Sequence, residues 1–103
     1  MERYHLWISG ADHEGSGGVI SVVNPYDGSV VAEVTAANEG DVRRAVDIAH
    51  RTFHAVMKTM PAYERARILR RASQLIAERA DDLVRTIVRE GGKPIRDARR
   101  EVS

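Results

Sequence analysis

The sequence Glu90-Gly91-Gly92-Lys93-Pro94-Ile95 interrupts a long run of helical periodicity in the C-terminal half of the chain. Glycine readily adopts the left-handed conformation that ends many helices, and proline is favoured in the first turn because its missing N–H would have no partner there. This stretch therefore predicts one helix that ends at Gly91-Gly92 and another that begins at Pro94. Ser103 interrupts the apolar period of the second helix, which consists of Ile95, Ala98 and Val102.

Upstream of this break, apolar residues recur at steps of three and four, which predicts amphipathic helices. Asn38 and Asp41 indicate where the first helix begins, because an Asn side chain can accept a backbone N–H and an acid favours the positive end of the helix dipole. Pro61 indicates the start of the next helix. Asp81-Asp82 is expected to cap a further helix within the same run. These two helices are expected near 62–79 and 82–90, before the one that begins at Pro94.

The N-terminal third is predicted to form strands. Tyr4–Ser9 alternates in a way that suits a short strand exposed on one face, whereas Gly10–Gly18 is expected to be a surface loop. Val19–Val23 and Val30–Val34 are β-branched runs, and the turn residues between them predict an antiparallel hairpin. The expected fold class is α+β, with the strand and hairpin in residues 4–35 and three to four helices in residues 38–103.

The composition limits the classes of function. The 103 residues suffice for one small domain, and 30% charged with 43% hydrophobic residues is typical of a globular protein. The net charge of +1 gives no excess field to attract nucleic acid or an anionic membrane, so neither partner is expected. No apolar run approaches the roughly 20 residues that span a bilayer, and no signal-peptide core is present, so a cytoplasmic location is expected.

The sequence contains no cysteine. Disulfides, thiolate metal sites and a cysteine nucleophile are therefore excluded within these 103 residues. Small aliphatic side chains dominate the candidate core, and each buries little area, so a fold built from this chain alone is expected to be marginally stable.

Two patterns resemble anion-binding elements. Gly15-Ser16-Gly17-Gly18 is rich in glycine, but it precedes a strand and not a helix N-terminus, so a flexible turn is the favoured interpretation over a nucleotide loop. Arginines along the long helices suggest a basic groove, but acidic residues alternate with them, which favours a face with many ion pairs.

His50 and His54 stand four residues apart on one helix face, a spacing that lets two imidazoles share a metal ion. No third ligand is placed nearby by the sequence. The favoured interpretation is a solvated or interface pair near the negative end of the helix dipole, and a metal site is the alternative.

Three stretches together resemble the opening segment of aldehyde dehydrogenases: Val23–Val31 around Asn24-Pro25, Glu64–Leu69, and Glu90–Ile95. The Asp41–Val46 stretch fits the same family. Gly91 departs from the usual Thr, and the variant looks most like members that act on lactaldehyde or glyceraldehyde 3-phosphate. The resemblance covers essentially the whole chain and implies a fragment of an α/β, Rossmann-like enzyme that oxidises aldehydes to acids with NAD or NADP.

The resemblance also implies which residues are missing. In family members the reactive cysteine, the assisting glutamate and the glycine motif that contacts the cofactor come later in the chain. No catalytic or cofactor-binding residue is therefore assigned within residues 1–103, and this segment alone is expected to be inactive and to bind no cofactor.

Glu90 is a further candidate ligand. A carboxylate at a helix C-terminus lies at the negative end of the dipole and needs a compensating cation, which Lys93 or Arg89 would supply. The resemblance implies an alternative, a structural monovalent cation held by Glu90 together with the backbone carbonyls of Val22 and Val23.

The apolar stripes exceed what a few strands and helices can cover among themselves. The chain is therefore expected to be the incomplete N-terminal segment of a longer protein, with the remainder of an aldehyde dehydrogenase chain as its partner. Exposed apolar faces would also favour a homo-oligomer. The alternative hypothesis is a stand-alone helical module for protein interaction.

Overall fold

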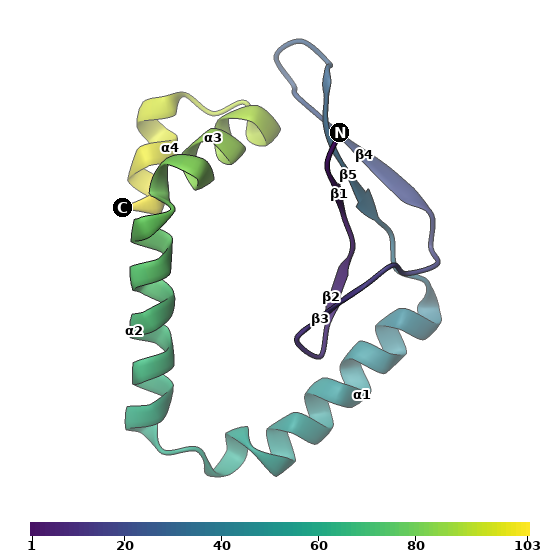
Figure 1. The fold of residues 1–103 in the computed structure, drawn as a ribbon, viewed down its shortest axis with the longest axis vertical. Coiled ribbons are helices and arrows are strands. Elements are labelled where there is room, and N and C mark those ends of the chain that lie inside the picture. Colours follow the sequence, from purple (N-terminus) through teal and green to yellow (C-terminus); the bar gives the residue numbers. More distant parts are fainter. The chain divides into compact units, whose positions relative to one another are not determined.

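The computed structural model describes residues 1–103, in which short strands are followed by helices (Figure 1). The strands are β1 Arg3–Tyr4, β2 Leu6–Ile8, β3 Ala11–His13, β4 Val19–Val23 and β5 Val30–Thr35. The helices are α1 Glu39–Ala55, the short 3-10 helix η1 Met57–Thr59, α2 Ala62–Glu78, α3 Ala80–Gly91 and α4 Ile95–Val102. The predicted α+β class is confirmed. The chain divides into two compact units, 1–22 with 30–60 and 23–29 with 61–103.

In the first unit, β5 is the central strand of a three-stranded sheet with the order β1-β5-β4. β1 pairs with β5 in parallel, with Arg3 opposite Glu33, and the side chains of this pair form an ion pair of 2.6 Å. The predicted hairpin of β4 and β5 is confirmed. The Ala36 N–H donates to the Gly18 carbonyl at 2.8 Å, next to the start of β4 and the end of β5.

Two predictions about the first 18 residues were wrong. Tyr4–Ser9 is not one strand, because the chain breaks at His5, and β1 joins β5 while β2 pairs with β3. Gly10–Gly18 is not entirely loop, because Ala11–His13 forms β3, antiparallel to β2. Ser9 and Gly10 have φ values of 56° and 73°, and two successive positive φ angles are what a tight two-residue hairpin turn requires.

In the second unit, the helix boundaries follow the proline and glycine signals. Pro61 and Pro94 precede α2 and α4, and Gly92 ends α3 in the left-handed conformation with φ 65°. The expectation that Asp81-Asp82 caps α3 was wrong. Arg79 occupies the cap position without a side-chain cap bond, and both acids lie inside the first turn, where they favour the positive end of the dipole.

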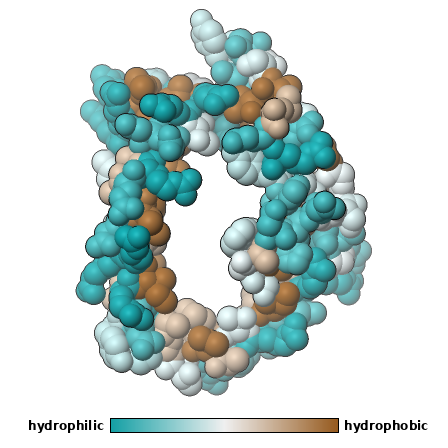
Figure 2. Space-filling model, viewed as in Figure 1, coloured by the Kyte–Doolittle hydropathy of each residue, from teal (hydrophilic) through white to brown (hydrophobic).

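The buried core of the chain is small. Ile8, Ala32, Val84 and Ala98 are its only buried hydrophobic residues, and none of the larger side chains is fully buried. Figure 2 shows hydrophobic residues at the surface along the helices. The exposed ones include large side chains on α1, α2 and α4, such as Phe53, Leu69 and Ile95.

No helix combines the length and the apolar character that crossing a membrane would require.

Candidate functional site

The C-terminal end of α3 carries the candidate ligand Glu90 and contacts the turn that follows β4. A Cβ atom added to Gly92 would lie 2.7 Å from Cγ of Pro25, so the backbone of the helix end touches the proline ring directly. The turn itself is closed by two backbone bonds of 2.8 Å, from the Asn24 N–H to the Ser29 carbonyl and from the Gly28 N–H to the Asn24 carbonyl. This contact fixes where the end of α3 lies within the second unit.

Glu90 lies exposed one residue before the end of α3 and makes no ion pair or hydrogen bond through its carboxylate. Lys93, which the sequence offered as its counter-ion, pairs with Glu101 of α4 instead. Arg89 also forms no ion pair with it. The carboxylate therefore lies at the negative end of a helix dipole without a compensating side chain.

The other two residues of the expected cation set lie on β4. Val22 is half-buried and belongs to the first unit, and Val23 is exposed and belongs to the second. No group of three His, Cys, Asp or Glu side chains is placed to hold a metal ion. The expected cation set consists of the Glu90 carboxylate and the backbone carbonyls of Val22 and Val23. It contains only one such side chain, so the absence of a three-residue group does not test it, and the site stays a prediction.

The glycine-rich stretch before β4 donates backbone hydrogen bonds to other residues of the first unit. The Gly17 N–H donates to the Ala36 carbonyl at 3.0 Å, and the Ser16 N–H donates to Oδ2 of Asp41 at 3.3 Å. A Cβ atom at Gly17 would lie 2.6 Å from the carbonyl of Ala36, so only glycine fits this approach. Because two of its N–H groups already have protein acceptors, the stretch does not form a phosphate cradle.

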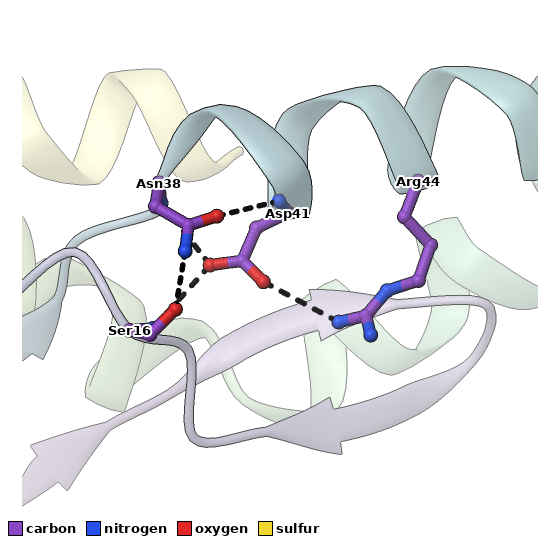
Figure 3. Close-up of polar contacts among 4 residues, drawn as sticks. All are labelled: Ser16, Asn38, Asp41 and Arg44. Atoms are coloured by element: carbon purple, nitrogen blue, oxygen red, sulfur yellow. Dashed lines mark hydrogen bonds and ion pairs between the residues drawn. The ribbon is translucent and has the colours of Figure 1, made fainter.

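Asp41 organises the junction between this stretch and α1 (Figure 3). Its Oδ2 atom also accepts the Asn38 N–H at 3.1 Å, while Oδ1 of Asn38 accepts the Asp41 N–H at 2.8 Å, which completes the capping box. Nδ2 of Asn38 donates to the hydroxyl of Ser16, and Arg44 approaches Oδ1 of Asp41 at 3.4 Å. The predicted helix start is confirmed, whereas the participation of Ser16 was missed because nothing in the local sequence indicates it.

Two of the arginines on α2 and α3 pair with acids, so the face with many ion pairs that the alternating charges predict forms only in part. Arg71 lies 3.5 Å from Glu78, and Arg85 lies 3.7 Å from Asp82. All four side chains are largely exposed, so each pair contributes little to stability.

Each unit has an apolar groove. In the first unit the groove lies between β2 and α1, and Ile8, Ala49 and Phe53 are among its lining residues. In the second unit α2, α3 and α4 line a groove of about 690 Å³, with Leu69, Ile76 and Val84 among its apolar residues. The groove of the first unit is lined by no titratable side chain, whereas Asp81, Arg99 and Glu101 also line that of the second.

Comparison with known proteins identifies the family. The family model described as aldehyde dehydrogenase family matches residues 12–103. An aldehyde-dehydrogenase-like protein of Sinorhizobium fredii is 40% identical over 83 residues, which cover 81% of this chain and 16% of that protein. The chain belongs to the aldehyde dehydrogenase family, and it corresponds to the N-terminal segment of these longer proteins.

Solved structures agree with this family. An NAD-dependent aldehyde dehydrogenase from Sinorhizobium meliloti is 34% identical with a TM-score of 0.92, and the match covers 98% of this chain and 21% of that one. PnpE, in a complex with nicotinamide adenine dinucleotide, is 37% identical with a TM-score of 0.86, over 93% of this chain and 20% of that one. The chain thus spans about a fifth of the length of these relatives.

Proposed function

We propose that this chain is the N-terminal part of an NAD(P)-dependent aldehyde dehydrogenase that oxidises an aldehyde to a carboxylic acid. The family match over residues 12–103 is the observation that carries the proposal. The cofactor, when bound, accepts a hydride from the substrate. Two similar structures are an NAD-dependent enzyme and an NAD complex, which supports a nicotinamide cofactor for the whole enzyme.

The role that we propose for these residues is structural. The 103 residues contain no cysteine, and the reactive cysteine of the family therefore has no counterpart among them. The exposed apolar faces of α1 and α2 would pack against the remainder of the enzyme chain, which is the partner that we propose. The aldehyde, the choice of NAD or NADP, and the cytoplasmic location stay predictions.

The test is an assay of NAD(P)-linked aldehyde oxidation with the purified 103-residue chain. We expect no turnover with either cofactor. We also expect activity to appear when this chain is added to a relative, such as the Sinorhizobium fredii protein, from which the matching segment has been deleted. Turnover by the 103-residue chain alone would contradict the structural role, and failure to restore activity to the deleted relative would count against the proposed family function.

Glu90 is proposed to take part in a structural site for a monovalent cation, together with the carbonyls of Val22 and Val23. Three features support the proposal: the carboxylate has no ion pair, it lies at the negative end of α3, and the contact of Gly92 with Pro25 brings this end to the turn after β4. In the whole enzyme, replacing K⁺ or Na⁺ by a large organic cation should lower the melting temperature. Glu90→Gln should abolish this dependence, and an unchanged dependence would contradict the site.

A second candidate function is a stand-alone module for protein interaction, and the exposed apolar side chains on α1 and α2 are the observation that favours it. Under this proposal the chain would form homo-oligomers through those faces. The activity assay separates the two functions, because an interaction module would not restore oxidation to the deleted relative.

A further inference from the structure

The imidazoles of His50 and His54 are in contact on the exposed surface of α1, and the ring of Phe53 also contacts His54, with centroids 5.3 Å apart. The centroids of the two histidine rings lie 4.6 Å apart with an interplanar angle of 62°, and neither ring makes a hydrogen bond or ion pair. Residues four apart on a helix lie on the same face. Neither histidine lines the groove between α1 and β2, although Phe53, which contacts His54, is among its lining residues.

The separation of the two rings suits a shared ligand. Two nitrogens that bind one zinc ion lie within about 4 Å of one another, because each Zn–N bond is about 2.0–2.1 Å long. Ring centroids 4.6 Å apart bring one nitrogen of each ring into that range with small changes of the side-chain torsions. The lack of a carboxylate partner on either ring also favours metal binding, because a histidine that already binds a carboxylate must give up that partner before it binds a metal.

The other histidines provide a contrast within the same chain. Nδ1 of His5 lies 2.9 Å from Oδ2 of Asp12, so this ring already has a partner. His13 lies on β3 opposite Leu6 and has no second imidazole in ring contact. His50 and His54 are therefore the one pair of imidazoles that meet.

We propose that His50 and His54 together bind one divalent transition-metal ion, with zinc as the expected cation and water as its other ligands. Neutral imidazole is a preferred ligand of zinc and copper, and two such ligands on one rigid helix form a chelate without any change of the backbone. No third side chain of His, Cys, Asp or Glu is placed to join them. The site is thus an accessory surface site that is independent of the proposed oxidation reaction, and its occupancy links two successive turns of α1.

Calorimetric titration of the untagged chain with Zn²⁺ alone tests the proposal. We expect one equivalent to bind, and His50→Gln and His54→Gln each to weaken binding by at least about tenfold, since even the loss of a partner that only orients a ligand costs that much. The matched control is the His5→Gln, His13→Gln double variant, which should bind as the unaltered chain does. Helical circular dichroism of each variant checks that α1 remains folded.

A second readout distinguishes a chelate from loose binding. With Cu²⁺ as the probe, electron paramagnetic resonance should report two nitrogen ligands in the unaltered chain and one in either single variant. Zinc should also raise the melting temperature of the chain but not that of the single variants, because a ligand that binds only the folded helix stabilises it. Binding that survives His50→Gln and His54→Gln, or no binding at all, would overturn the proposal.

Discussion

Asp41 is the one charged residue that the fold buries, and the N–H groups of Asn38 and Ser16 both depend on its carboxylate. Asp41→Ala removes both acceptor contacts and half of the capping box. Loss of a helix cap costs about 1 kcal/mol, and unsatisfied N–H groups add to that, so we expect the free energy of unfolding to fall by about 1–2 kcal/mol. Urea unfolding followed by circular dichroism measures this loss.

Asp47→Ala is the matched control for Asp41→Ala. Asp47 is an exposed acid on the same helix without an ion pair, so its removal changes the net charge equally but should alter the free energy of unfolding by no more than about 0.5 kcal/mol. Equal losses in the two variants would show that charge, and not the junction with Ser16, explains the effect.

Gly92 and Gly91 are adjacent, yet they should respond to substitution in opposite directions. Gly92 has φ 65°, and its added Cβ would lie 2.7 Å from the ring of Pro25, so Gly92→Ala should destabilise the second unit by about 1–2 kcal/mol or more. A Cβ at Gly91 meets no atom within 4 Å, and alanine favours a helix over glycine by up to about 1 kcal/mol. Thermal unfolding compares the two variants, and a stable Gly92→Ala would contradict the described contact.

Asp27 has a pKa below its usual value because the Ser29 hydroxyl and the Ser29 N–H both donate to its carboxylate, at 2.6 Å and 2.9 Å. A lowered pKa in the folded state means that this carboxylate contributes stability above its unfolded pKa, and that the contribution is lost as the pH falls through its folded pKa. Ser29→Ala should move the titration midpoint of Asp27 upward in an NMR experiment. An unchanged midpoint would exclude the hydroxyl as the main cause.

For individual residues, the sequence predicted contacts between neighbours in the chain and missed contacts between residues far apart in the chain. Asn38 and Asp41 are three residues apart, so their spacing alone indicates the capping box. Ser16 joins the same cluster from 25 residues before Asp41, and no rule of spacing connects them. The prediction for Lys93 failed for the same reason, because its partner Glu101 lies on the next helix.

Among the elements, α3 and α4 make the tightest helix contact, with Val84 5% exposed and Ala98 fully buried between them. Val84→Ala should lower the free energy of unfolding by about 1–2 kcal/mol, from the lost burial and the small cavity left behind. Leu69→Ala removes a larger side chain but one that is 70% exposed, so it should cost less than about 0.5 kcal/mol. Urea unfolding at low protein concentration compares the two variants. A larger loss of unfolding free energy in Leu69→Ala than in Val84→Ala would contradict this order.

The helices were more predictable than the small strands. Periodicity with Pro61, Gly92 and Pro94 gives the start of α2, the end of α3 and the start of α4, because these residues act through their own backbones. β3 was missed because Ala11-Asp12-His13 has little preference for strands, and its pairing depends on a turn in which Ser9 adopts a positive φ. The break between α2 and α3 lies at Arg79, which is neither a glycine nor a proline, so its position was predicted only approximately.

For the molecule as a whole, the solvent-exposed area shows how much surface the chain leaves uncovered. The chain exposes 8079 Å², whereas a folded monomer of this mass is expected to expose roughly 5,800 Å². The difference, about 2,300 Å², is comparable with the area that one partner contributes to a permanent interface. The periodic stripes in the sequence predicted this excess qualitatively, because they require more apolar cover than the strands provide.

We propose that other protein covers these apolar faces. Sedimentation velocity of the purified 103-residue chain over a range of concentrations tests it most directly. We expect self-association that grows with concentration and weakens in Leu69→Ala, because removing this exposed side chain reduces the apolar face. A monomer at every concentration, with no binding of a dye that detects exposed apolar surface, would contradict the claim.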